Sequence, residues 1–129
     1  MGFVKVTGEI GMREDASHEV EFLVDTGSFY SFVPPELGES LGISFPVTSR
    51  VVMADSRTVE VGVGVGYLRL GDRAGGIIVA AMEVPMPLLG ASALEVLGIK
   101  VDPVEEILEH SRPFGPAALA SAPLDRPLI

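Results

Sequence analysis

Apolar and polar residues alternate along much of the chain, which is the pattern of β-strands with one buried face. We expect strands at residues 3–10, 19–24, 29–33, 47–54, 58–70 and 77–84. Stretches rich in turn-forming residues separate several of them, at 14–17, 55–57 and 71–76. The turns at 14–17 and 55–57 each lie between two expected strands, so each predicts a β-hairpin.

Helical character is confined to three short segments, at residues 35–41, 91–97 and 104–110. Pro35 suits the first turn of the first helix, and Gly98 suits the end of the second. The third segment carries the densest acidic cluster of the chain, which we assign to the solvated face of a short helix: Glu105, Glu106 and Glu109. Short strands with so few helices predict a mainly β, closed, barrel-like fold.

Composition narrows the class of protein. The chain has 129 residues, enough for one domain with a modest core, and 47% of them are hydrophobic. It contains no cysteine, which excludes disulfides and thiolate metal sites. Its net charge of −9 argues against nucleic acid or an anionic membrane as a partner. We find neither a signal peptide nor a membrane-length apolar run, so the cytoplasm is the default location.

The most informative stretch is residues 22–28, in which an apolar strand runs directly into Asp25. A carboxylate beside buried residues is poorly tolerated unless it is hydrogen-bonded or paired. Thr26 and Ser28 supply hydroxyls that can donate to it, and Gly27 permits a close approach or a backbone conformation that a side chain would forbid. The alternative is that Asp25 merely caps the following turn through local backbone hydrogen bonds.

A second element, Leu88-Leu89-Gly90, follows about sixty residues later and leads into the segment at 91–97. Together the two elements resemble the active-site loop and its supporting segment in the retropepsin-like aspartic protease family, the retroviral-type proteases with a single lobe. The resemblance extends over residues 3–103. It implies a closed acid-protease barrel with a flap hairpin, assembled as a two-fold homodimer.

The resemblance also assigns roles to individual residues. Asp25 would be the catalytic carboxylate and Ser28 a hydrogen-bond donor to it, while Thr26 would bond across the dimer axis and Gly27 would let backbone lie close. Three further residues would support the loop from below: Leu88, Leu89 and Gly90. The substrate-binding flap would be the hairpin at Met53, Ala54, Asp55, Ser56 and Arg57.

Peptide hydrolysis by this chemistry needs two carboxyl groups, one ionised to activate water and one protonated to polarise the carbonyl. The chain offers one Asp-Thr-Gly sequence. Four other aspartates lack that setting: Asp15, Asp55 and Asp72 lie in polar turns, and Asp102 precedes a proline. The second carboxyl must therefore come from another copy of the chain. The mechanism requires no metal and no cofactor.

Two departures from the family pattern matter. In retropepsins, Arg and then Asp or Asn commonly follow the glycine of the second element and brace the dimer. Ala91 and Ser92 stand there in this chain, so the bracing must differ. The flap tip also lacks the glycine-rich pattern of viral enzymes and carries charged residues instead.

Several other signals point to structure rather than to chemistry. The Val-Gly repeat at 62–67 predicts a strand with close-packed neighbours, not a dinucleotide site. His18 and His110 lie in polar surroundings, which favours surface positions over metal binding. The aromatic residues after the Asp loop either line a pocket or pack in the core, and both interpretations stay open: Phe29, Tyr30 and Phe32.

The pattern therefore predicts a protease domain at residues 1–110 and a Pro/Ala-rich tail at 111–129. The tail is partly disordered or adds a strand at 124–129 to the dimer interface; Pro123 and Pro127 favour disorder. The predicted function is that of a homodimeric aspartic endopeptidase acting on polypeptide. The alternative is a dimeric peptide-binding or scaffolding module of the same fold with little or no proteolysis.

Overall fold

A computed structural model describes residues 4–113 of the chain. The strands are β1 (Lys5–Gly11), β2 (Ser17–Asp25), β3 (Ser31–Val33), β4 (Val47–Val52), β5 (Thr58–Leu70), β6 (Arg73–Ala81), β7 (Leu88–Gly90), β8 (Ile99–Asp102) and β9 (Ile107–His110). The helices are α1 (Pro35–Ser40), α2 (Ala91–Leu97) and a single 3₁₀ turn, Glu14–Ala16. No helix in this part of the chain is long and apolar enough to cross a membrane.

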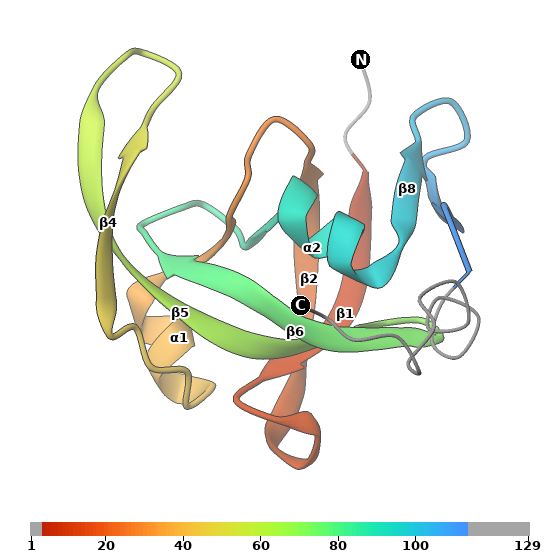
Figure 1. Cartoon of the computed structure of the whole chain (residues 1–129), viewed down its shortest axis with the longest axis horizontal. Helices are drawn as coiled ribbons and strands as arrows, with labels where there is room; N and C mark the ends of the chain where they lie inside the picture. Colours follow the sequence, from red (N-terminus) through yellow and green to blue (C-terminus); the bar gives the residue numbers. More distant parts are fainter. Residues whose placement is uncertain (1–3, 114–129) are drawn as a thin grey trace, which may run out of the picture.

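Six strands close into a barrel, which confirms the expected mainly β fold with few helices. The strands follow one another in the order β1-β2-β7-β3-β6-β5, and β5 pairs back onto β1 where Ile10 lies opposite Leu68. Strand β4 pairs with β5 alone. The β4–β5 hairpin therefore extends away from the barrel as a tall arm, drawn in yellow (Figure 1).

Two apolar clusters hold the chain together. The barrel core contains Ile10, Phe22 and Leu68, each fully buried, and it continues beneath α2. A smaller group, which we call the hairpin cluster, lies at the base of the arm. It consists of three buried residues, Phe32, Val61 and Ala80, and seven half-buried ones, Tyr30, Val51, Val59, Val63, Met82, Val84 and Leu88.

The helix expected at residues 104–110 is wrong, because the chain there turns back and forms β9 against β8. The Asp102 carboxylate accepts hydrogen bonds from the backbone N–H groups of Val104, at 2.9 Å, and Glu105, at 3.1 Å. Glu106 then adopts the left-handed conformation, with φ of 58°. These contacts close a turn, so the acidic cluster lies on a hairpin and not on a helix.

Other boundaries shift by a few residues. The expected turn at 71–76 narrows to Gly71 and Asp72, because Gly71 has φ of +61° and Leu70 already pairs with Arg73. Strand β3 begins at Ser31 instead of residue 29. Residues 114–129 lie outside the described part of the chain, and with them the strand considered at 124–129.

The Val-Gly repeat forms part of β5, as predicted, and its glycines face close neighbours. An ideal Cβ on Gly64 would lie 1.8 Å from the carbonyl oxygen of Ser44, and one on Gly62 would lie 2.9 Å from Cβ of Phe45. The segment before β4 thus lies directly on the backbone of β5.

The tip of the β4–β5 hairpin is closed by its own polar groups. Met53 N–H donates to Arg57 O at 2.7 Å, and Ser56 N–H donates to Met53 O at 2.9 Å. Ser56 has φ of 72°, so it is the left-handed residue that follows the tight turn in a hairpin loop of this kind. The Asp55 carboxylate accepts from the Arg57 backbone N–H at 3.0 Å and from its guanidinium at 2.7 Å. The charged tip is therefore a self-contained turn.

We predict that Gly64→Ala lowers the free energy of unfolding by about 1–3 kcal/mol or more, since the added methyl group collides with backbone. Gly76→Ala on the neighbouring strand is the matched control, because its Cβ would meet no atom closer than 3.8 Å. We expect the control to be neutral or stabilising within about 1 kcal/mol. Urea denaturation of both variants measures the difference, and equal losses would contradict the close approach.

We predict that the hairpin tip loosens only below about pH 3.8. The hydrogen bonds from Arg57, its backbone N–H first, hold the pKa of Asp55 below its usual value of 3.8. The folded tip thus favours the ionised form, so its stabilisation is complete above pH 3.8 and is lost as the pH falls through the lowered pKa. NMR amide shifts of residues 53–57 should follow this loss, and Asp55→Asn should abolish the pH dependence at any acidity.

Candidate active site

Asp25 is the last residue of β2 and lies beside Gly90, the last residue of β7. The parallel pairing of these strands places Val24 opposite Leu89, which is fully buried in the barrel core. The side chain of Asp25 is itself only half-buried. The strand therefore delivers the carboxylate from an apolar interior to the edge of the barrel, where charge is tolerated.

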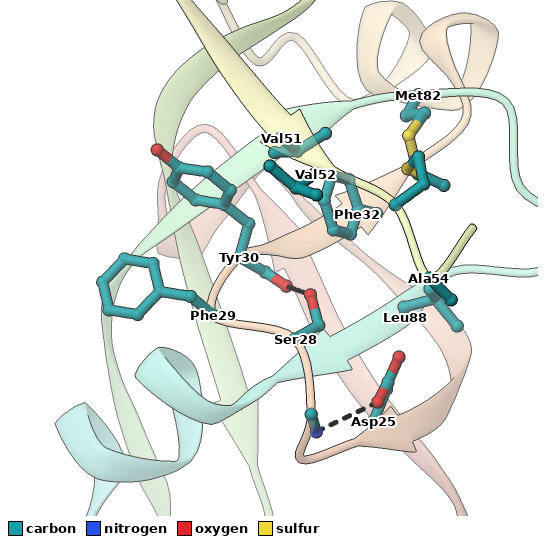
Figure 2. A pocket seen from close by; sticks show the side chains of 12 residues that line it. Asp25, Ser28, Phe29, Tyr30, Phe32, Val51, Val52, Ala54, Met82 and Leu88 are labelled. Carbon is teal, nitrogen blue, oxygen red and sulfur yellow. Dashed lines mark hydrogen bonds between the residues drawn. The ribbon is translucent and has the colours of Figure 1, made fainter. Parts of the chain in front are cut away.

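The loop after Asp25 is held by local hydrogen bonds. Gly27 N–H donates to Oδ1 of Asp25 at 3.1 Å, and Ser28 N–H donates to the Asp25 carbonyl at 3.1 Å. Asp25 does cap its turn, and this leaves Oδ2 without a contact from that turn. The expected Ser28 bond to the carboxylate is wrong: Ser28 Oγ donates to Tyr30 O at 2.8 Å, because the loop turns its hydroxyl away from Asp25 (Figure 2).

Thr26 and Gly27 lie at the exposed turn of this loop. A Cβ on Gly27 would meet only Oδ1 of Asp25, at 3.4 Å, which is an ordinary contact. Its backbone is not left-handed either, since the glycines with positive φ are others. Within one protomer, a side chain at Gly27 would thus crowd nothing except the carboxylate.

The crowded glycine is Gly90. An ideal Cβ there would lie 2.2 Å from Tyr30 O and 2.8 Å from Phe29 O, so any side chain would collide with the loop. Gly90 N–H donates to Oγ of Ser31 at 3.0 Å, and Ser31 is fully buried. Gly90 therefore packs directly against the backbone of the loop, next to Asp25.

Helix α2 continues this support from its first residues. Ala91 N–H donates to Ser28 O at 2.7 Å, and Ser92 N–H donates to Phe29 O at 3.2 Å. The Ser92 hydroxyl also donates to Phe29 O. The residues that differ from the retropepsin pattern thus brace the loop within the protomer. The sequence did not predict the role of Ser31 as the buried partner of Gly90 N–H. The one signal for it was a serine within an otherwise apolar strand.

A cavity of about 560 Å³ opens between this loop and the β4–β5 hairpin. Asp25 and Ser28 line it from the loop, and Val51, Val52 and Ala54 line it from the hairpin (Figure 2). Gly27 of the loop and Met53 of the hairpin line it as well. Asp25 is the one carboxylate among the lining residues, whose remaining walls are mainly apolar. The cavity thus brings together the predicted catalytic residue and part of the predicted flap.

The flap and support residues divide between this cavity and other places. Met53 and Ala54 line the cavity, whereas the turn residues Asp55, Ser56 and Arg57 do not. Asp55 bonds to Arg57, and Ser56 N–H donates to Met53 O. Leu88 lines the cavity, while Leu89 points into the barrel core.

The aromatic residues left open by the sequence serve both purposes. Phe29, Tyr30 and Phe32 all line the cavity, and Phe32 is also buried in the hairpin cluster. Tyr30 makes edge-to-face contacts with both neighbours, at ring-centroid distances of 5.4 Å to Phe29 and 6.1 Å to Phe32. Phe29 is 60% exposed, so it forms an apolar rim beside the Asp loop.

Residues 4–113 contain no group of three or more His, Asp or Glu side chains placed to hold a metal ion. His18 is exposed, and His110 Nε2 lies 2.8 Å from Oδ1 of Asp72, beside a second cavity of about 160 Å³. This contact with His110 lowers the pKa of Asp72. Asp25 is the one carboxylate among the residues that line the larger cavity.

The Asp25 loop, the β4–β5 hairpin and the Gly90 segment all lie within the part of the chain that matches a known protein family. None of the curated proteins compared with the chain matches it. A family model described as aspartyl protease matches residues 6–103, from the first strand of the barrel to the turn after β8. Because this match spans most of the chain, including the Asp loop, the hairpin and the Gly90 segment, the chain belongs to the aspartyl protease family.

Proposed function

We propose that the protein is an aspartic endopeptidase whose active site forms between two copies of the chain. The observation that carries the proposal is the position of Asp25, the one carboxylate lining an apolar cavity beneath a hairpin, in a member of the aspartyl protease family. The other acidic residues of the described chain line no part of that cavity. One carboxylate cannot act as base and acid in the same step, so a second copy supplies its partner.

The proposed chemistry follows from two carboxyl groups held close together. Their mutual repulsion keeps one ionised and the other protonated, as is well known for aspartic proteases. The ionised carboxylate accepts a proton from a water molecule while the oxygen of that water attacks the carbon of the peptide carbonyl. The protonated carboxyl donates a hydrogen bond to the carbonyl oxygen. As the C–N bond breaks, the carboxyl group that took the proton from water gives it to the leaving amine nitrogen. No covalent intermediate forms.

The surroundings of Asp25 suit a two-fold contact. Thr26 is exposed and Phe29 is 60% exposed, so polar and apolar groups beside the carboxylate are available to a second copy. In a two-fold dimer the same patch serves both partners, which brings each Asp25 to the axis. Thr26 then lies where it can hydrogen-bond across the axis, and Gly27 keeps the approach to the carboxylate clear.

The proposed substrate is an extended polypeptide. The hairpin crosses the cavity opposite Asp25, and a hairpin can bind a peptide backbone as an added strand does. Leu88, Phe32 and Val51 belong to the cavity wall, so apolar side chains next to the cleaved bond fit best.

We predict that Asp25→Asn removes peptidase activity while leaving the fold intact, because the two side chains have nearly the same volume. Cleavage of a quenched fluorescent peptide library between about pH 4 and pH 7 measures the loss, which general acid–base catalysis predicts to be at least about 100-fold. Thermal unfolding and sedimentation of the variant serve as the control for folding and assembly. Full activity of Asp25→Asn would contradict the mechanism, and peptide binding without cleavage by the wild type would favour the binding-module alternative.

A subunit-mixing experiment tests the shared site directly. If each site needs one Asp25 from each copy, an equal mixture of wild type and Asp25→Asn should retain about a quarter of the activity of the same total amount of wild-type chain, since only dimers of two wild-type chains are active. Sites contained within one chain would retain about half. Sedimentation of tagged and untagged chains verifies that the subunits exchange.

A further inference from the structure

Tyr30 connects the loop that carries Asp25 to the hairpin above it. Its hydroxyl lies 3.2 Å from Oγ of Ser49 on β4, and either group can donate the hydrogen bond. Tyr30 follows Asp25 by five positions, and its side chain points away from the carboxylate (Figure 2). The bond therefore joins two elements that form opposite sides of the cavity.

The partner of Tyr30 is correctly oriented by strand geometry. Side chains alternate between the faces of β4, so Ser49 and Val51 are half-buried on the inner face, whereas Arg50 and Val52 are exposed. Ser49 lies opposite Val61, a buried member of the hairpin cluster. A hydroxyl in this apolar setting is stabilised by a hydrogen bond, which Tyr30 provides.

The ring of Tyr30 is held in place from two sides. Phe29 and Phe32 make edge-to-face contacts with it, at interplanar angles of 76° and 82°. Contacts of this kind restrict the ring and therefore fix the direction of the hydroxyl. The contact with Ser49 consequently constrains β4 rather than Tyr30.

Strand β4 has few other attachments. It pairs with β5 on one edge only, and the ion pairs and hydrogen bonds of the tip stay within the hairpin. In the described part of the chain, no other side-chain hydrogen bond connects β4 or the tip at residues 53–57 to an element outside the hairpin. Apart from its pairing with β5, strand β4 is thus held by the apolar base of the hairpin and by this one polar contact.

We propose that Tyr30 is a positioning residue, whose hydrogen bond with Ser49 holds the hairpin so that Met53 and Ala54 cover the cavity above Asp25. The catalytic consequence of this contact rests on the proposed function. Holding the cover in place before substrate arrives reduces the ordering that binding requires, so loss of the contact weakens substrate binding more than it slows the chemical step.

The first test is independent of catalysis. Amide hydrogen exchange of residues 47–58 is compared among wild type, Tyr30→Phe, Ser49→Ala and the double variant. Tyr30→Phe keeps the ring and removes only the hydroxyl. Each single variant should exchange about two- to tenfold faster in the hairpin, the range expected for loss of one net hydrogen bond. The double variant should exchange no faster than either one, because both changes remove the same contact.

Two further variants serve as controls. Ser49→Thr keeps a hydroxyl on a residue suited to strands, so its exchange should stay close to that of the wild type. Tyr67→Phe removes the hydroxyl of the second of the two tyrosines, which lines no part of the cavity, and should leave hairpin exchange unchanged.

Kinetics with a cleaved peptide provide the second test. Tyr30→Phe and Ser49→Ala should raise KM about two- to tenfold and change kcat less than KM. Ser49→Thr, which keeps a hydroxyl, should have a KM close to that of the wild type. Hairpin exchange equal to wild type in Tyr30→Phe would overturn the proposal, and so would faster exchange spread equally over β1 and β2. If the hairpin responds as expected but no peptide is cleaved, the contact stands and the proposed function fails. If cleavage depends on Asp25 but hairpin exchange is unchanged, the proposed function stands and the positioning role fails.

Discussion

The close approach of Gly90 to the loop after Asp25 is the constraint on which the candidate site depends. Strands β2 and β3 are consecutive in the chain, but β7 lies between them in the sheet and pairs with both. The connection at residues 26–30 must therefore cross the end of β7, where Gly90 leaves no space for a side chain beneath the Phe29 and Tyr30 carbonyls. The first residues of α2 donate to the same loop. Asp25 thus lies at the start of a connection that the backbone of β7 and of α2 supports.

The molecule divides into a rigid part and an attached arm. The barrel core is closed by strand pairing on every side, so its members have few ways to move independently. The hairpin beyond it depends on a much smaller cluster, whose buried members are Phe32, Val61 and Ala80. A small cluster beside an unpaired strand edge belongs to the less stable end of a fold. The side of the cavity that carries Asp25 is therefore held by more contacts than the side that carries Met53.

Local sequence patterns predicted the elements whose cause is local. The alternation of apolar and polar residues explains the strands. Gly98, in the left-handed conformation, explains the end of α2, and the polar residues at 55–57 explain the turn of the hairpin. The helix expected at 104–110 failed because the Asp102 carboxylate caps a turn, a contact that outweighs weak helical propensity. The supporting roles of Ser31 and Ser92 depend on how distant segments meet, which periodicity does not encode. The partner of Ser28 is local, but it depends on the path of the loop, which periodicity does not encode either. The motif therefore located the site, and only the fold identified which hydroxyls support it.

The glycine repeat of β5 has a consequence for how the chain finds its pairing. Residues 61–66 read Val-Gly-Val-Gly-Val-Gly, so shifting this strand by two positions replaces each residue with one of its own kind. Such a segment contains almost no information about alignment with its neighbours. In the β4–β5 hairpin, the turn therefore sets the register. The left-handed Ser56 and the Asp55–Arg57 contact fix the number of residues in the loop between the two strands. The charged tip, which departs from the viral pattern, thus also sets the register in which β4 and β5 pair as the hairpin folds.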